Sequence, residues 1–125
     1  MSSGERDLET LIRDMDPVLD PIEYIYASGP DPVPGAICTF REAEGVTSIV
    51  PRSDVDRLGI AFTYPCRRIT LTVHSSLEAV GLLAAIATLL AKHGISVNAV
   101  SAYYHDHLFV RPEDAPRALE LLAGV

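Results

Sequence analysis

The sequence is short of basic residues, and this shortage argues against two kinds of partner. Lys and Arg number 10 against 17 Asp and Glu, which gives a net charge of -7. Residues 1–65 hold 12 acidic and 5 basic residues (5 − 12 = −7), whereas residues 66–125 hold 5 of each. Nucleic acids and anionic membranes are bound through clustered Lys and Arg. Since neither half carries a basic stripe, we expect neither partner.

Cysteine and long apolar runs are also scarce. Cys38 and Cys66 stand far apart without a CxxC motif or a metal-ligand spacing, which predicts buried or idle thiols in a reducing compartment. The opening residues, MSSGERDLE, contain no apolar stretch typical of a signal peptide. The most apolar run, Ala79–Ala91, is too short to span a bilayer. We therefore expect a cytoplasmic protein.

The common signatures of catalysis are missing as well. The sequence has no nucleophile elbow, no glycine-rich phosphate loop and no triad order. A histidine, His74 or His105, acting as general base beside Ser75 or Ser76 is the weaker alternative. We expect no enzyme activity and no cofactor.

The segment Arg67–Val110 organises the rest of the chain. Alternation of apolar and polar residues predicts a strand over Arg68–His74. Ser75 and Ser76 follow as candidate N-caps of a helix that runs to about His93, where Gly94 provides the C-cap. A second strand, Ile95–Tyr104, should lie parallel to the first through a right-handed crossover.

The end of the chain completes this unit. His105-Asp106-His107 is predicted to form a hairpin turn before a strand over Leu108–Val110, and a helix is predicted from Pro112. The resulting order is strand, helix, strand, turn, strand, helix. No strand follows the last helix.

This order and three short motifs resemble the ACT domain, a ferredoxin-like module that usually binds amino acids. The motifs are the strand ITLTV, the run Gly81–Ile86 and the run His93–Val97. ACT domains commonly have proline before the first of these glycines, where this chain has Val80. VHSSLEAVGL and YYHDHLFV are similar to segments of small bacterial ACT-like proteins of unknown function. The resemblance implies a ferredoxin-like α/β sandwich with an amino-acid-binding or regulatory role.

Residues 1–65 carry a second set of elements. Their patterns predict a helix, a strand, a β-hairpin, a short helix and a last strand, over Asp7–Met15, Ile22–Ala27, Ala36–Arg41 with Val46–Val50, Ser53–Leu58 and Ile60–Tyr64. Compared with the ACT order, residues 1–65 lack an opening strand and residues 66–125 lack a closing one. We therefore predict an α+β protein of two interleaved ACT-like halves, 1–65 and 66–125. In this arrangement Ile22–Ala27 completes the C-terminal sheet. A single ferredoxin-like domain with a β-rich appendage is the alternative.

The predicted topology gathers polar residues at one end of the C-terminal unit. His74, Ser75, Ser76 and Glu78 follow the first strand, and this end also holds the HDH turn. The free amides of a helix N-terminus suit a carboxylate. Asp106 or Glu78 can then pair with the ammonium of an amino acid. The candidate ligand-binding residues are His74, Ser75, Ser76, Glu78, Gly81, Asn98, Tyr104, His105, Asp106 and His107.

Other interpretations of these residues remain open. The serines can serve only as helix caps beside a solvated turn. A metal site can be built from His74, His105 and His107 with a carboxylate as fourth ligand. The chain can also be a structural module that assembles without a small ligand. In any of these cases the apolar helix Ala79–Ala91 predicts a homodimer.

Overall fold

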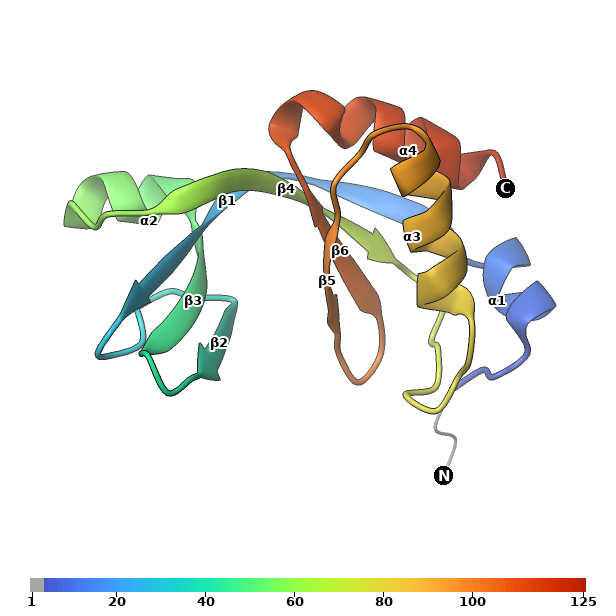
Figure 1. The fold of residues 1–125 in the computed structure, drawn as a ribbon, viewed down its shortest axis with the longest axis horizontal. Helices are drawn as coiled ribbons and strands as arrows, with labels where there is room; N and C mark the ends of the chain where they lie inside the picture. Colours follow the sequence, from blue (N-terminus) through green and yellow to red (C-terminus); the bar gives the residue numbers. More distant parts are fainter. Residues whose placement is uncertain (1–3) are drawn as a thin grey trace.

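The computed structural model describes residues 4–125 and contains one mixed sheet-and-helix body (Figure 1). Its six-stranded sheet has the order β2-β3-β1-β4-β6-β5, and every neighbouring pair is antiparallel. The strands are β1 Pro17–Gly29, β2 Cys38–Arg41, β3 Val46–Pro51, β4 Thr63–Leu71, β5 Asn98–Ser101 and β6 Asp106–Val110. The helices are α1 Leu8–Arg13, α2 Arg52–Leu58, α3 Leu82–Lys92, the short 3-10 turn η1 Pro112–Asp114 and α4 Ala115–Ala123.

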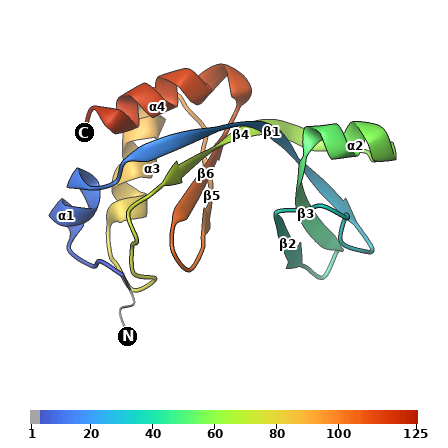
Figure 2. The same cartoon turned by 180° about the vertical axis from the view of Figure 1, so that it is seen from behind.

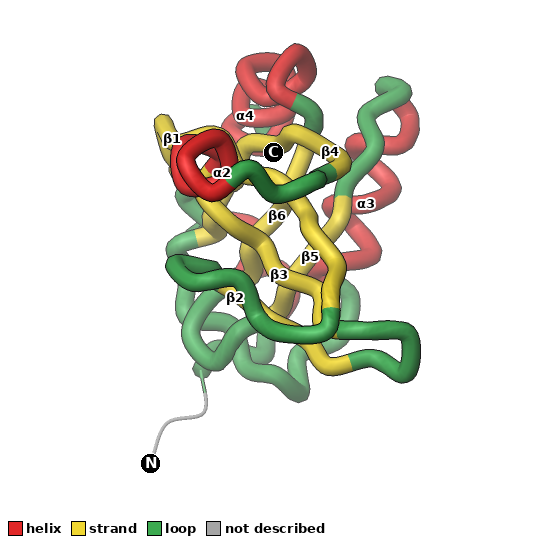
Figure 3. The backbone as a smooth tube through the Cα atoms, turned by 90° about the vertical axis from the view of Figure 1, so that its left-hand side faces the viewer, coloured by secondary structure: helices red, strands yellow, loops and turns green. Residues whose placement is uncertain are grey.

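The two long strands β1 and β4 form an arch that joins the ends of the molecule (Figure 1). The hairpins β2–β3 and β5–β6 both extend from β1 and β4 toward the same side of the molecule, as the end-on view in Figure 3 also shows. Helices α1, α3 and α4 gather at one end, and α2 lies at the other (Figure 2). The strand order reads alike from either edge, as β2-β3-β1 and β5-β6-β4. Two similar halves thus meet at β1 and β4.

Strand β1 belongs to both halves, which confirms the interleaved fold. It pairs with β4 through Pro17–Leu19, Glu23, Tyr24 and Tyr26, and with β3 through Tyr24–Gly29. The predicted segment Ile22–Ala27 does pair with β4, but the strand begins earlier than predicted, at Pro17. The strand continues through Pro21 because the pairing register shifts between Leu19 and Glu23. A proline without an amide hydrogen is tolerated at such an irregularity.

Strand β4 also differs from the prediction. Two strands, Ile60–Tyr64 and Arg68–His74, were expected, but one strand runs continuously over Thr63–Leu71. A second register shift between Tyr24 and Tyr26, with Tyr64 at a φ of 55°, accommodates Pro65 inside the strand. The strand ends early because the amide of Thr72 donates to the carbonyl of Met15 at 2.9 Å instead of continuing the ladder.

Helix α3 begins seven residues after Ser75, so the prediction of serine N-caps was wrong. The helix starts at Leu82, and Gly81 precedes it at a φ of 104° without a side-chain cap. Ser75 and Ser76 instead lie in an extended loop, where the amide of Ser76 donates to the carbonyl of Glu5 at 2.8 Å. The predicted helix end is confirmed. Gly94 has a φ of 72°, which favours glycine, and its amide donates to the carbonyl of Ala91.

The second hairpin turns earlier than predicted. Ala102–His105 connect β5 to β6, and the amide of Ala102 donates to the carbonyl of His105 at 3.0 Å. Asp106 and His107 are therefore strand residues and not part of the turn. Strands β4 and β5 run parallel, as predicted, but β6 lies between them. Because side chains alternate along a strand, Asp106 and His107 point to opposite faces of the sheet.

The main core lies between the sheet and helices α1, α3 and α4. It includes Leu11, Met15, Ile69, Leu71, Leu82, Ile86, Leu90, Leu108, Val110 and Leu122, all buried. Leu11 and Met15 come from the N-terminal half of the chain and fill a core built mainly by the C-terminal half. The opposite face of the sheet carries a smaller cluster of Tyr24, Ile49, Cys66 and Phe109.

Candidate functional site

A small cavity lies beside the loop that joins β4 to α3. Its volume is about 160 Å³, and it is lined by Ser75, Ser76, Leu77, Ala79, Leu82, Leu83, Ser101 and Asp106. The lining combines a loop, the first turn of α3 and the adjoining ends of β5 and β6. Its polar groups are three hydroxyls and one carboxylate.

The carboxylate of Asp106 is the most unusual group in this lining. Asp106 is 9% exposed, and its Oδ2 accepts a hydrogen bond of 3.2 Å from Ser75, which is 7% exposed. Among residues 4–125, no Lys, Arg or His makes an ion pair with Asp106. Charged donors such as an ammonium form the strongest hydrogen bonds with a carboxylate. The cavity therefore favours a positively charged group near Asp106.

The beginning of α3 offers the opposite charge. The first amides of a helix have no partner within the helix, and here Gly81 supplies no side-chain cap. The first turn also has no acidic residue, and its first two residues, Leu82 and Leu83, line the cavity. The helix dipole adds partial positive charge at this end. A carboxylate placed here can accept hydrogen bonds from backbone amides.

Ser76 and Glu78 shape the loop. The Oγ of Ser76 accepts a hydrogen bond of 3.1 Å from the amide of Glu78, and the carbonyl of Ser76 accepts one from Ala79. The side chain of Glu78 is exposed and does not line the cavity. Of the two carboxylates suggested by the sequence, only Asp106 faces the cavity.

The structure separates the histidines from the cavity and from each other. His107 Nδ1 lies 2.9 Å from Thr70 Oγ1, and His105 Nδ1 lies 3.2 Å from the carbonyl of Val73. The rings of His105 and His107 are 6.4 Å apart. His107 lies on the face of the sheet opposite to Asp106, because the two are consecutive residues of β6. Burial, with help from the guanidinium of Arg68, lowers the pKa of His107. The fold therefore disfavours the protonated form of this histidine.

His74 belongs to a third location. Its ring lies 5.1 Å from the ring of Tyr104 and 6.1 Å from that of Tyr103, measured between centroids. Its buried Nε2 has no hydrogen-bond partner among the described residues. Within residues 4–125, no group of three or more His, Cys, Asp or Glu is arranged to hold a metal ion. The hypothesis of a three-histidine metal site is therefore not supported.

Two further candidates lie away from the cavity. Tyr104 is exposed at the tip of the β5–β6 hairpin, and Asn98 opens β5. Asn98 lines a different hollow of about 530 Å³, together with Tyr26, Phe40, Glu42 and residues of neighbouring strands. Ser101 was not predicted, although it faces the cavity. It pairs with Asp106 across the β5–β6 hairpin, which becomes apparent only once the turn is placed at Ala102–His105.

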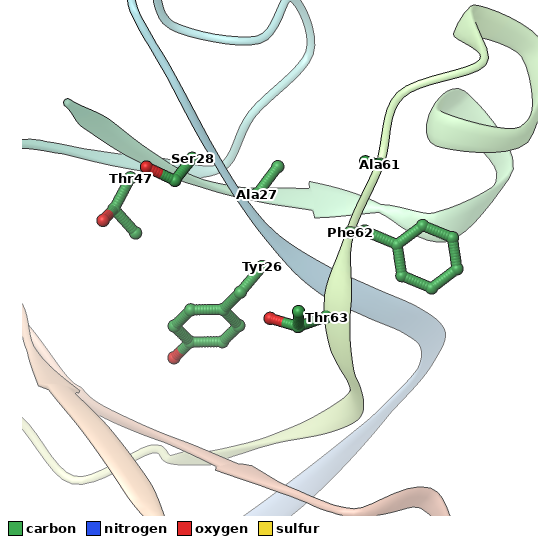
Figure 4. A pocket seen from close by; sticks show the side chains of 7 residues that line it. All are labelled: Tyr26, Ala27, Ser28, Thr47, Ala61, Phe62 and Thr63. Carbon is green, nitrogen blue, oxygen red and sulfur yellow. The ribbon is translucent and has the colours of Figure 1, made fainter.

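The N-terminal half has a hollow of its own, but one of different chemistry. Its volume is about 440 Å³, and Tyr26, Ala27, Ser28, Thr47, Ala61, Phe62 and Thr63 line it. Figure 4 shows the ring of Phe62 pointing away from that of Tyr26. This lining carries hydroxyls but no charged side chain. It offers no counterpart to the buried Asp106.

The hollow of the N-terminal half lacks counterparts of Asp106 and of the α3 N-terminus for structural reasons. Val46 opens β3 as Asp106 opens β6, and the two strands share the same burial pattern over five residues. A proline-rich segment, Pro30–Gly35, occupies the chain position of α3, and the amide of Val33 donates to Ser48 Oγ at 3.1 Å. Since three prolines exclude a helix in this segment, it provides no counterpart of the α3 N-terminus.

Comparison with known proteins places the chain in the ACT-domain family. Two ACT-domain family models match it, one over residues 3–67 and the other over residues 63–124. The chain therefore belongs to the ACT-domain family, and each half matches one of the two models. Its sheet and helices form the ferredoxin-like fold that the sequence predicted. No curated protein matches the chain.

Several solved structures share this architecture. A protein of unknown function from Vibrio cholerae, described as a possible transport protein, is 42% identical, with a TM-score of 0.84 over 94% of each chain. A protein from Agrobacterium tumefaciens is 18% identical, with a TM-score of 0.65 over 82% of this chain and 80% of its own. The regulatory subunit of aspartate kinase from Thermus thermophilus is 11% identical, with a TM-score of 0.62 over 86% of this chain and 94% of its own.

The length and apolar character of the described helices decide whether any of them can cross a membrane. Within residues 4–125, none is both long enough and apolar enough to cross a bilayer.

Proposed function

We propose that this protein is a non-catalytic regulatory module that binds a small amino acid in the cavity beside Ser75 and Asp106. The observation that carries the proposal is the buried carboxylate of Asp106, which has one hydroxyl partner and shares its cavity with the uncapped start of α3. These two features present opposite charges to a single small space. An amino acid at neutral pH carries an ammonium and a carboxylate on one carbon atom, and so matches both.

Each end of the ligand has a proposed contact. The ammonium pairs with Asp106, where a charge-assisted hydrogen bond offsets the cost of burying the carboxylate. The ligand's carboxylate accepts from the first amides of α3, next to Gly81. Ser75 orients Asp106, and Ser101 supplies a further hydroxyl. A cavity of about 160 Å³ is below the usual range for drug-sized ligands, which favours glycine, alanine or serine over larger amino acids.

Family membership supports a regulatory role. ACT domains generally bind amino acids and control other proteins, and one structural relative is itself the regulatory subunit of aspartate kinase. The division into two units near residue 65 is part of the same proposal, with the amino-acid site in the second. Two free thiols, Cys38 and Cys66, are consistent with a cytoplasmic protein.

We also propose a homodimer. Three aliphatic side chains are exposed next to the cavity, those of Leu77, Val80 and Leu83. Val80 is 83% exposed. Exposed aliphatic side chains grouped in this way are typical of an interface. Light scattering at tens of micromolar tests this point. A dimer that forms while no amino acid binds would favour the alternative function, a structural module without a small ligand.

A thermal-shift screen of the twenty amino acids tests the proposed function. A ligand that binds only the folded protein, at 100 times its Kd, adds about 2.7 kcal/mol of stability. For a chain of this size, that raises the Tm by several degrees. We expect the largest shift among the small amino acids. A flat response to all twenty would contradict the proposal.

A further inference from the structure

The N-terminal residues pair with the loop that forms one wall of the cavity. Glu5 and Ser75 form a parallel β-bridge outside the main sheet. The amide of Glu5 donates to the carbonyl of His74 at 2.7 Å, and the carbonyl of Glu5 accepts from the amide of Ser76 at 2.8 Å. The backbone on both sides of Ser75 is thus held by one residue, 70 positions earlier in the chain.

Gly4 makes this close approach possible. Its φ is 97°, a conformation that favours glycine, and a Cβ atom added there would lie 2.8 Å from the carbonyl carbon of Ser75 and 2.8 Å from the amide nitrogen of Ser76. It would also lie 2.9 Å from Cδ2 of His74. Since two of these atoms belong to the backbone, no side chain fits at Gly4 without moving the loop.

The same N-terminal segment holds the other end of the loop. A Cβ atom on Gly81, just before α3, would lie 3.1 Å from Cδ2 of Leu8. Leu8 opens α1, whose start is fixed by Asp7, because the Oδ2 of Asp7 accepts from the amide of Thr10 at 3.0 Å. Glu5 therefore holds the beginning of the loop, and Leu8 packs on its end.

Apart from the strap, the hydrogen bond of Ser75 to Asp106 anchors one side chain of the loop to the sheet. Within the loop, hydrogen bonds join Ser76 to Glu78 and Ala79. Fixing each backbone residue of a free loop costs about 1–2 kcal/mol of conformational entropy. If the loop were loose, a ligand would have to order it on binding and its affinity would fall.

We propose that residues 4–8 form a strap that positions the loop His74–Gly81 for ligand binding, with Gly4 and Glu5 as positioning residues. The inference rests on the proposed amino-acid site and adds the element that pre-organises it. The strap contacts the loop backbone, whereas the ligand in the proposed site contacts Asp106 and the first amides of α3. Ligand binding and strap docking therefore stabilise each other, because coupling between two binding events is reciprocal.

The test compares two glycines that both have positive φ. Gly4→Ala introduces a backbone clash, whereas Gly59→Ala, at a φ of 67° with no neighbouring atom within 4 Å, introduces only the conformational strain. Hydrogen exchange at the amide of Ser76 reports strap docking. Calorimetric titration with glycine, L-alanine and L-serine reports binding. We expect Gly4→Ala to speed this exchange and to raise the Kd about tenfold, within the usual range of coupling between sites, while Gly59→Ala changes neither.

A second pair of variants avoids backbone strain. Leu8→Ala removes the side chain that covers Gly81, and Leu58→Ala on α2 is its control, since the two leucines are 36% and 41% exposed. We expect weaker binding for Leu8→Ala alone. If the wild type binds a probe and both strap variants bind it equally well, the strap is overturned while the proposed function stands. If the wild type binds none of the three probes, the proposed function falls and the strap's role falls with it.

Discussion

The hydroxyl of Ser75 donates to Oδ2 of Asp106 at 3.2 Å, joining the loop after β4 to the first residue of β6. Both residues are buried, and the sequence separates them by 31 positions. Their contact links the loop that closes the cavity to the sheet on which the cavity is built. The wall and the floor of the candidate site are thus fixed relative to each other.

Replacing Ser75 by alanine tests this link. The variant leaves the buried carboxylate of Asp106 without its hydroxyl donor, and an unsatisfied buried acceptor costs about 1–3 kcal/mol. We expect the free energy of unfolding to fall by an amount in this range, measured by urea denaturation. Ser53→Ala, at an exposed position on α2, is the control and should change stability little. Equal stability of the two variants would show that the hydrogen bond contributes nothing.

His107 predicts a pH dependence of stability. Burial lowers its pKa in the folded protein below the ordinary value of 6.5, so the unfolded chain binds a proton more readily. This stabilising contribution is present above pH 6.5 and is lost as the pH falls toward the pKa of the folded state. We expect the Tm to fall between pH 7 and pH 5, and His107→Gln to reduce this fall. An equally steep fall of the Tm in His107→Gln and in the wild type would contradict this assignment.

Leu11 provides a test of the interleaved fold. Leu11 belongs to α1 but is fully buried in the core beneath α3 and α4. Leu11→Ala should destabilise the whole protein by about 2–5 kcal/mol, in one cooperative transition. A fragment of residues 65–125 lacks Leu11, Met15 and strand β1, so it should aggregate or fail to fold. A soluble fragment that melts cooperatively would contradict the interleaved arrangement.

The fold was largely predictable because its signals are local. The alternation of apolar and polar residues around Ile69–Leu71 predicts a strand from residues close in sequence. The apolar periodicity of the helix and the glycine at its end, Gly94, are local signals as well. The errors share one physical origin, which is pairing between distant segments. Pro21 and Pro65 are ordinarily strand breakers, but both are accommodated where the register of β1 against β4 shifts.

The site was predicted less well, for the same reason. Ser75 and Ser76 have the local character of helix caps, but the backbone of Glu5 draws their loop into an extended conformation. The hairpin turn begins three residues earlier than predicted, at Ala102, so Asp106 and His107 are consecutive strand residues and point to opposite faces of the sheet. Asp106 and Ser75 were correctly brought together, since the end of β4 and the beginning of β6 meet at one edge of the sheet.

The central claim is that Asp106 binds the ammonium of a small amino acid. The most direct test is calorimetric titration of the wild type, Asp106→Asn and Glu78→Gln with glycine, L-alanine and L-serine. Glu78→Gln removes the exposed carboxylate of the same loop and so controls for net charge. We expect at least one of these amino acids to bind at one site per chain, since the N-terminal half lacks the buried carboxylate. Losing the charge-assisted contact in Asp106→Asn should weaken this binding by about tenfold or more, whereas Glu78→Gln binds like the wild type. Unchanged affinity in Asp106→Asn, or no binding by the wild type, would contradict the account.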